Sequence, residues 1–177
     1  IQRRDQLLSQ QTTDATPDGS ALRALLEGGE TALLETIEAA GLRGRGGAGF
    51  ATGMKWRFCR QAEADCRYVV CNADEGEPGT FKDRVLLNSY ADSVIEGMTL
   101  CAGIVGAQRG YLYLRGEYRH LFKPLRQLLQ QRRENRLLGR NILGKPGFDF
   151  DIEIHLGAGA YVCGEESSLI ESLEGKR

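Results

Sequence analysis

Gly-Leu-Arg-Gly-Arg-Gly-Gly-Ala-Gly-Phe-Ala-Thr-Gly-Met-Lys-Trp, residues 41–56, is the stretch around which the rest of the chain is organised. Its first thirteen residues include six glycines and no acidic residue. Because glycine has no Cβ, the backbone N–H groups of such a run can approach a ligand closely and form a concave nest for an anion. Arg43, Arg45 and Lys55 add positive charge beside this nest, and arginine can donate two hydrogen bonds to a phosphate. The stretch therefore predicts a loop that binds a phosphorylated cofactor.

Residues 44–49 also satisfy the dinucleotide-binding pattern G-x-G-x-x-G, but their context argues against an ordinary Rossmann assignment. That pattern requires a strand before the glycines and a helix opening from them. Residues 31–40 instead carry apolar side chains at helical spacing, and Gly41 is placed to end that helix. The alternative interpretation, a flexible linker, is disfavoured because linkers seldom contain bulky aromatic residues such as Phe50 and Trp56.

Composition limits the function classes. The 177 residues are enough for one domain with a hydrophobic core. Lysine and arginine number 23 against 24 aspartates and glutamates, a balance that argues against nucleic acid or an anionic membrane as partner. No apolar run approaches membrane-spanning length. We expect no direct membrane insertion and a cytoplasmic location, or the cytoplasmic face of a membrane-bound complex.

The five cysteines and two histidines are scattered along the chain, with no C-x-x-C pair. Zinc and iron–sulfur sites need clustered ligands. We therefore expect reduced thiols that pack as small apolar side chains, and no metal ligated by this chain.

The order of elements predicts an α/β fold with at least partly parallel pairing. Residues 1–19 are polar and are interpreted as a linker or the end of a preceding segment, and residues 20–177 as the domain. A short helix closed by Gly28 and Gly29 precedes the helix over 31–40. Strands are expected at 67–73, 110–116 and 148–155, and helices at about 88–106, from just before Pro124 to 138, and from 165 onward. The first strand is expected to be buried, and the third, which alternates strictly, to be half-buried near a sheet edge.

Two turns beside these strands carry polar groups. Residues 72–80 hold three carboxylates within four positions, directly after the first strand, where open α/β sheets place ligands. A solvated turn is the alternative. A second glycine loop, residues 157–164, runs into Glu165 and Glu166 at the start of the last helix. These two acids either complement the helix dipole or face a ligand.

Three motifs, residues 41–56, 71–84 and 157–177, resemble the NADH-oxidising flavoprotein subunit of respiratory complex I. The same family includes the diaphorase subunits of NAD-reducing hydrogenases and of NAD-dependent formate dehydrogenases. The motifs occur in the family's order and spacing, and residues 75–77 and 113–118 are more similar to the hydrogenase and formate dehydrogenase members.

The resemblance implies a Rossmann-like FMN-binding domain with a central sheet flanked by helices. It also implies hydride transfer between NADH and FMN, with onward single-electron transfer to iron–sulfur partner subunits. The implied site residues fall into three groups. The phosphate and ribityl end of FMN would be held by Gly44, Arg45, Gly46 and Lys55. The flavin would be lined by Asn72, Asp74, Glu75, Tyr161, Gly164 and Glu165. NADH would stack on Phe50 and Phe58 and hydrogen-bond to Glu77 and Glu166. No side chain need act as acid, base or nucleophile, because the cofactors carry the chemistry.

Two departures from the family pattern qualify these expectations. Ala51 stands where the family usually has proline. The chain also stops before the family's further adenine-stacking aromatic residue, asparagine-rich FMN loop, ubiquitin-like domain and four-cysteine cluster motif, so we expect a fragment whose site is incomplete at its C-terminus. The alternative function is a non-catalytic fragment or assembly module that keeps the fold and binds iron–sulfur partners. A P-loop kinase or ATPase is excluded because the chain has no G-x-x-x-x-G-K-[S/T] motif.

Overall fold

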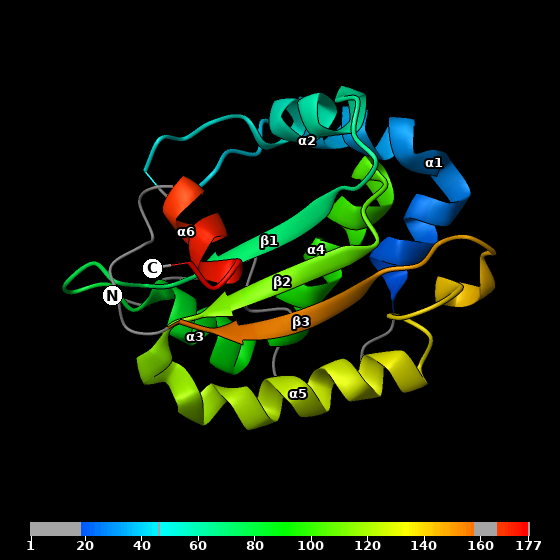
Figure 1. Cartoon of the computed structure of the whole chain (residues 1–177). Helices are drawn as coiled ribbons and strands as arrows, with labels where there is room; N and C mark the ends of the chain where they lie inside the picture. Colours follow the sequence, from blue (N-terminus) through cyan, green and yellow to red (C-terminus); the bar gives the residue numbers. More distant parts are fainter. Residues whose placement is uncertain (1–18, 46, 158–165, 177) are drawn as a thin grey trace, which may run out of the picture.

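The structure is a computed structural model that describes residues 19–45, 47–157 and 166–176. Helices and strands alternate along the chain, which confirms the predicted α/β class (Figure 1). The elements are α1 (Ser20–Ala39), α2 (Thr52–Gln61), β1 (Tyr68–Ala73), α3 (Lys82–Ser89), α4 (Ala91–Val105), β2 (Arg109–Leu114), the 3-10 turn η1 (Gly116–Tyr118), α5 (Arg119–Glu134), the 3-10 turn η2 (Ile142–Gly144), β3 (Asp151–Leu156) and α6 (Glu166–Leu173).

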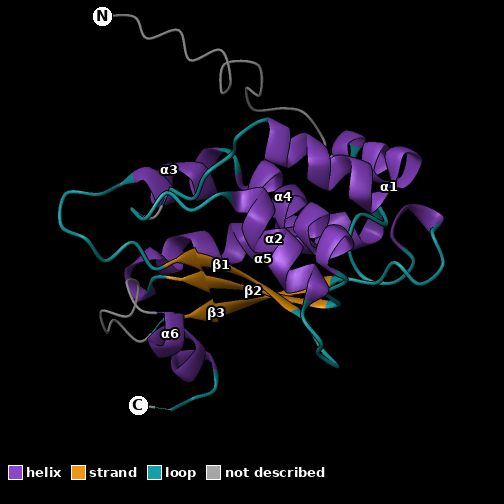
Figure 2. Ribbon diagram, turned by 90° about the horizontal axis from the view of Figure 1, so that it is seen from above, coloured by secondary structure: helices purple, strands orange, loops and turns teal. Residues whose placement is uncertain are grey.

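The three strands form one parallel sheet in the order β1-β2-β3. Helices α1 to α4 lie above the sheet and α6 lies below it in Figure 2, while α5 runs alongside β3 in Figure 1. The core between the sheet and the helices, α5 included, is largely aliphatic, with Ile95, Leu112 and Leu125 among its fully or almost fully buried members. This arrangement leaves β1 and β3 at the two edges, as predicted for the third strand.

The prediction that the first strand is buried was wrong for part of it. Tyr68 is 51% exposed and Val70 is 40% exposed, whereas Val69 and Ala73 are buried. Successive side chains of a strand point to opposite faces of the sheet. Tyr68 and Val70 share the face away from Val69 and Ala73, and most of the described helices pack on the other one.

Glycine determines where the first helical segments end, as the sequence indicated. Gly29 has φ 81° and ψ 162°, which divides α1 into the two helical parts expected from the sequence. Gly41 follows α1 with φ 62°, and its amide donates to the carbonyl of Glu38. Both conformations carry a strong steric penalty for residues with a Cβ.

Helices α2 and α3 were not predicted, and the helix after β2 begins earlier than expected. It starts at Arg119 rather than just before Pro124, which lies inside α5. A proline within a helix removes one backbone hydrogen bond, but packing of Leu121, Leu125 and Leu129 into the core sustains this helix.

A buried arginine joins three helices. The Arg132 side chain of α5 is fully buried, and its guanidinium pairs with Asp92 and, at 3.5 Å, with Glu96, both of α4. The other carboxylate oxygen of Glu96 accepts a hydrogen bond of 3.1 Å from the backbone amide of Ala21 in α1. The charge pairing therefore fixes the relative positions of α1, α4 and α5.

Candidate functional site

The loops expected to bind ligands gather at one end of the sheet. Because the strands are parallel, the segments that follow β1, β2 and β3 all start at the same end of the sheet, where the carboxyl ends of the strands lie. The glycine loop between α1 and α2 also extends toward this carboxyl end of the sheet, on the left in Figure 1, where the strand arrows end. The structure thus brings the glycine loop and the acidic turn to a common end of the molecule.

Hydrogen bonds across the glycine loop close it, whereas its tip is exposed. The amide of Gly44 donates to the carbonyl of Phe50 at 2.8 Å, and the Arg43 guanidinium donates to the carbonyl of Gly49 at 3.0 Å. Arg43 therefore helps to hold the loop itself. At the tip, Gly47 has φ 116° and no atom within 4 Å of where a Cβ would lie. The backbone there is accessible to a ligand.

Helix packing anchors the base of this loop. The Glu38 carboxylate of α1 accepts hydrogen bonds of 2.8 and 2.5 Å from the Arg57 guanidinium of α2. These hydrogen bonds lower the pKa of the Glu38 carboxyl and raise the pKa of Arg57. A Cβ at Gly53 would lie 3.2 Å from the backbone N and Cα of Glu38, so the two helices touch at the end of the loop.

Cationic and apolar side chains flank the loop. Arg45 and Lys55 are exposed. Phe50 and Phe58 are 46% and 55% exposed, and Met54 between them is 45% exposed. Met54 and Phe58, four residues apart, lie on one side of α2, and Phe50 lies two residues before this helix begins. Met54 was not singled out from the sequence, although this spacing marks it; Gly46, predicted in the same group, lies outside the described residues.

The acidic turn divides into a buried and an exposed part. Asp74 and Glu75 are 6% and 5% exposed, whereas Glu77 is exposed. Asn72, exposed near the end of β1, accepts a hydrogen bond of 3.0 Å from the Asp74 amide through Oδ1. The alternative of a uniformly solvated turn is therefore wrong.

Both carboxylate oxygens of Glu75 accept hydrogen bonds from the protein. Oε1 accepts from the Asp83 amide at 2.9 Å, and Oε2 accepts from the Arg84 amide at 3.3 Å. Oε2 also accepts from the Tyr118 hydroxyl at 2.8 Å. Glu75 thus caps the N-terminus of α3, where a negative charge is favoured by the helix dipole. Tyr118 was not identified from the sequence, which carries no signal for this contact.

Stability should depend on the ionisation of Glu75. Burial raises its pKa, but the amide and Tyr118 hydrogen bonds outweigh burial, so the pKa lies below the ordinary 4.5. A carboxylate with a lowered folded-state pKa stabilises the fold above its unfolded pKa, and this contribution is lost as the pH falls through the folded value. Between about pH 7 and pH 3, we expect the unfolding free energy of the unaltered chain to fall more than that of a Glu75→Gln variant. Urea unfolding at each pH measures this, and parallel curves would contradict it.

Most of the predicted residues of the second glycine loop, Tyr161, Gly164 and Glu165, lie outside the described residues. Glu166 is the first residue of α6. Tyr113 of β2 contacts the helix that follows this loop, because its hydroxyl lies 2.8 Å from Ser172 Oγ of α6. A Cβ at Gly157 would lie 3.0 Å from the Tyr113 ring.

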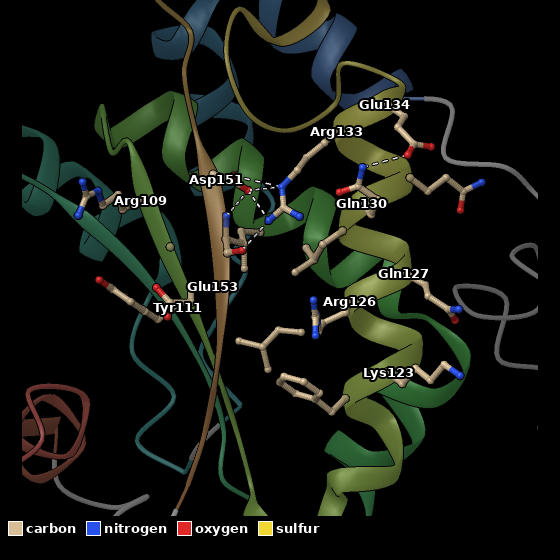
Figure 3. A pocket seen from close by; sticks show the side chains of 16 residues that line it. Arg109, Tyr111, Lys123, Arg126, Gln127, Gln130, Arg133, Glu134, Asp151 and Glu153 are labelled. Carbon is tan, nitrogen blue, oxygen red and sulfur yellow. Dashed lines mark hydrogen bonds and ion pairs between the residues drawn. The ribbon is translucent and has the colours of Figure 1, made fainter.

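A hollow of about 950 Å³ lies elsewhere, between α5 and strands β2 and β3 (Figure 3). None of the predicted site residues lines it. Arg133 reaches across from α5 to Asp151 and, at 3.2 Å, to the carbonyl of Ile152. The residues that line this hollow carry charges of both signs. We therefore interpret the hollow as a polar part of the surface and not as the cofactor site.

Thiol chemistry and metal binding gain no support from the part of the chain that is described. Burial raises the pKa of Cys71 to about 11 and that of Cys101 to about 12, which keeps both as unreactive thiols near neutral pH. The described cysteines are free, and no group of three potential metal ligands occurs among the described residues. No described helix is both long and apolar enough to span a membrane.

The chain is similar to known proteins along most of its length. The family model described as the Nuo51 FMN-binding domain matches residues 37–177. The alpha subunit of the NAD-reducing hydrogenase HoxS from Cupriavidus necator is 61% identical over 145 residues, which cover 82% of this chain and 24% of the relative. A subunit of the NADH-quinone oxidoreductase from Escherichia coli is 49% identical over 146 residues, covering 82% of this chain and 33% of the relative.

A third relative carries a different coenzyme in its name. The HndC subunit of an NADP-reducing hydrogenase from Solidesulfovibrio fructosivorans is 51% identical over 145 residues, covering 82% of this chain and 29% of the relative.

The crystal structure of an NAD+-reducing [NiFe]-hydrogenase in the H2-reduced state has a TM-score of 0.80 and 48% identity, covering 96% of this chain and 28% of that chain. The chain spans about a quarter to a third of these curated relatives.

Proposed function

Because the chain belongs to the Nuo51 FMN-binding domain family, we propose that it binds FMN and NAD(H) and supports hydride transfer between them. The observation that carries the proposal is the glycine loop, whose exposed backbone tip extends toward the carboxyl end of the sheet beside Arg45 and Lys55. Backbone amides and two cations are the donors that a phosphate monoester requires. The residues present thus fit the phosphate end of FMN.

The remaining contacts follow the three groups given by the motifs. Gly44, Arg45, Gly46 and Lys55 hold the phosphate and ribityl end of FMN, and Asn72, Asp74, Glu75, Tyr161, Gly164 and Glu165 line the flavin. Phe50 and Phe58 offer exposed aromatic faces on which an adenine can stack. Glu77 and Glu166 accept hydrogen bonds from the ribose or nicotinamide end of NADH. The exposure of Phe50, Phe58 and Glu77 supports their availability to a ligand.

FMN, when bound, supplies the hydride acceptor and the conversion from two-electron to one-electron transfer. The chain contributes binding, orientation and electrostatics. Iron–sulfur electron-transfer subunits are the proposed partners, consistent with the multi-subunit enzymes named among the relatives. A cytoplasmic location, or the cytoplasmic face of a membrane complex, belongs to the same proposal.

Titration with FMN tests the binding step. FMN fluorescence should be quenched on addition of the chain, and anaerobic NADH should then bleach the visible flavin spectrum. Lys55→Gln should weaken FMN binding by about tenfold, the effect of losing one charge-assisted hydrogen bond. Lys123→Gln, which removes an exposed lysine on α5, should leave the affinity unchanged. Absence of quenching, or equal effects of the two variants, would contradict the proposed phosphate site; quenching without bleaching would favour an assembly module.

Coenzyme choice is a separate prediction. Family membership leaves it open, because one relative is named NADP-reducing. Carboxylates at Glu77 and Glu166 would repel the extra phosphate of NADPH, so we expect a preference for NADH. A Glu77→Gln, Glu166→Gln double variant should gain about tenfold in NADPH activity relative to NADH activity. An unchanged ratio of kcat/KM values would exclude this electrostatic explanation.

A further inference from the structure

A network of hydrogen bonds ties the acidic turn to the segment that follows β2. The Arg115 guanidinium donates to the backbone carbonyl of Glu75, and its backbone amide donates to the carbonyl of Ala73 at 3.1 Å. The same guanidinium is held by two hydrogen bonds of 2.8 Å to the Glu117 carboxylate. Tyr118 donates to the Glu75 carboxylate. Arg115 and Tyr118 thus hold the main chain and the side chain of Glu75, respectively.

This network closes the exposed part of the turn into a loop. The Glu75 carboxylate accepts from the Asp83 amide, so residues 75 and 83 are joined at the base. Within the loop, the Thr80 hydroxyl and amide both donate to the carbonyl of Glu77, at 2.6 and 3.2 Å. The position of Glu77 therefore depends on a base that Arg115 and Tyr118 fix.

We propose that Arg115 and Tyr118 are positioning residues that set the geometry of the acidic turn, and through it the affinity for NAD(H) and FMN. The inference rests on the proposed function and adds two residues that contact neither ligand in it. Glu75 then serves the site as an anchor, because both oxygens of its carboxylate already accept hydrogen bonds from the protein.

The physical basis is the cost of a buried carboxylate without its donors. Glu75 is 5% exposed, so water cannot readily replace the Tyr118 hydroxyl. Loss of a donor to a buried charge shifts the surrounding backbone or lets water enter. Small displacements of a binding group reduce binding and rate strongly, and the group displaced here is the turn that carries Glu77.

The test compares Tyr118→Phe with Tyr68→Phe, which removes a hydroxyl from an exposed tyrosine at the opposite end of β1. Tyr118→Phe should raise the FMN Kd and the KM for NADH by about tenfold, with a smaller change in kcat. Amide hydrogen exchange of residues 75–84, measured without FMN, should accelerate in Tyr118→Phe, and the melting temperature should fall by a few degrees, the cost of losing one hydrogen bond to a buried carboxylate in a domain of this size. Tyr68→Phe should alter none of these quantities.

Arg115→Lys provides the second variant, because lysine keeps the charge but cannot reach Glu75 and Glu117 with the same fork. We expect the exchange rate, the FMN Kd and the KM for NADH of Arg115→Lys to lie between the values of the unaltered chain and those of Arg115→Gln. If Tyr118→Phe and Arg115→Gln both leave exchange, Kd and KM unchanged, the positioning role is overturned. If exchange accelerates but Kd and KM do not change, the hydrogen bonds serve only the fold and the proposal fails. If the unaltered chain binds no FMN, the proposed function itself fails, while exchange still reports on the hydrogen-bond network.

Discussion

Arg132→Ala is expected to lower the free energy of unfolding by about 3–5 kcal/mol, the usual cost of removing one partner from a buried ion pair. The Arg132 side chain is fully buried, and Glu96, which it pairs with, is only 13% exposed. The variant leaves the carboxylates of Asp92 and Glu96 facing a cavity without their cation. Urea unfolding followed by circular dichroism measures the change.

Arg133→Ala is the matched control, because Arg133 is the adjacent residue on α5 but its pair with Asp151 is solvent-accessible, with side chains 35% and 49% exposed. Exposed pairs of this kind contribute about 0–1 kcal/mol. Similar losses in the two variants would show that Arg132 does not act through buried charge pairing.

Gly53→Ala is expected to destabilise the chain and weaken FMN binding together. The added methyl group would lie 3.2 Å from the backbone of Glu38, and backbone cannot rotate away as a side chain can. Overpacking costs about 1–3 kcal/mol, against a helix-propensity gain of up to about 1 kcal/mol for alanine over glycine. Separation of α1 and α2 would also disturb the Glu38–Arg57 pair at the base of the glycine loop. Thermal unfolding and FMN titration measure the two effects.

Gly97→Ala makes the same change inside α4, where no atom lies within 4 Å of the added Cβ. It should stabilise the chain by about 0.5–1 kcal/mol and leave FMN affinity unchanged. Because the two variants are predicted to differ in sign, a stabilised Gly53→Ala would refute the proposed contact between the helices.

Local patterns in the sequence were sufficient for much of the fold. Helical spacing followed by Gly41 predicted the end of α1, and strict alternation over residues 148–155 predicted β3 as an edge strand. Helices α2 and α3 were missed because they bury few residues and so lack a clear apolar face; α2 buries only Gly53 and α3 only Leu87. Their stability comes from packing and capping by distant residues, which a local pattern does not reveal.

For the site, the sequence by itself determined the family, the glycine loop with its cations, and the placement of an acidic turn directly after a strand. These features can be read locally, because they depend on residues that are close together in the sequence: glycines free the backbone of the loop, adjacent basic residues supply its charge, and a short apolar run marks the strand that the acidic turn follows. Only the tertiary structure decided that Glu75 is buried while Glu77 is exposed, and that Arg115 and Tyr118 hold the turn. Those contacts join residues 40 and 43 positions apart, and the parallel pairing of β1 with β2 brings them together at one edge of the sheet.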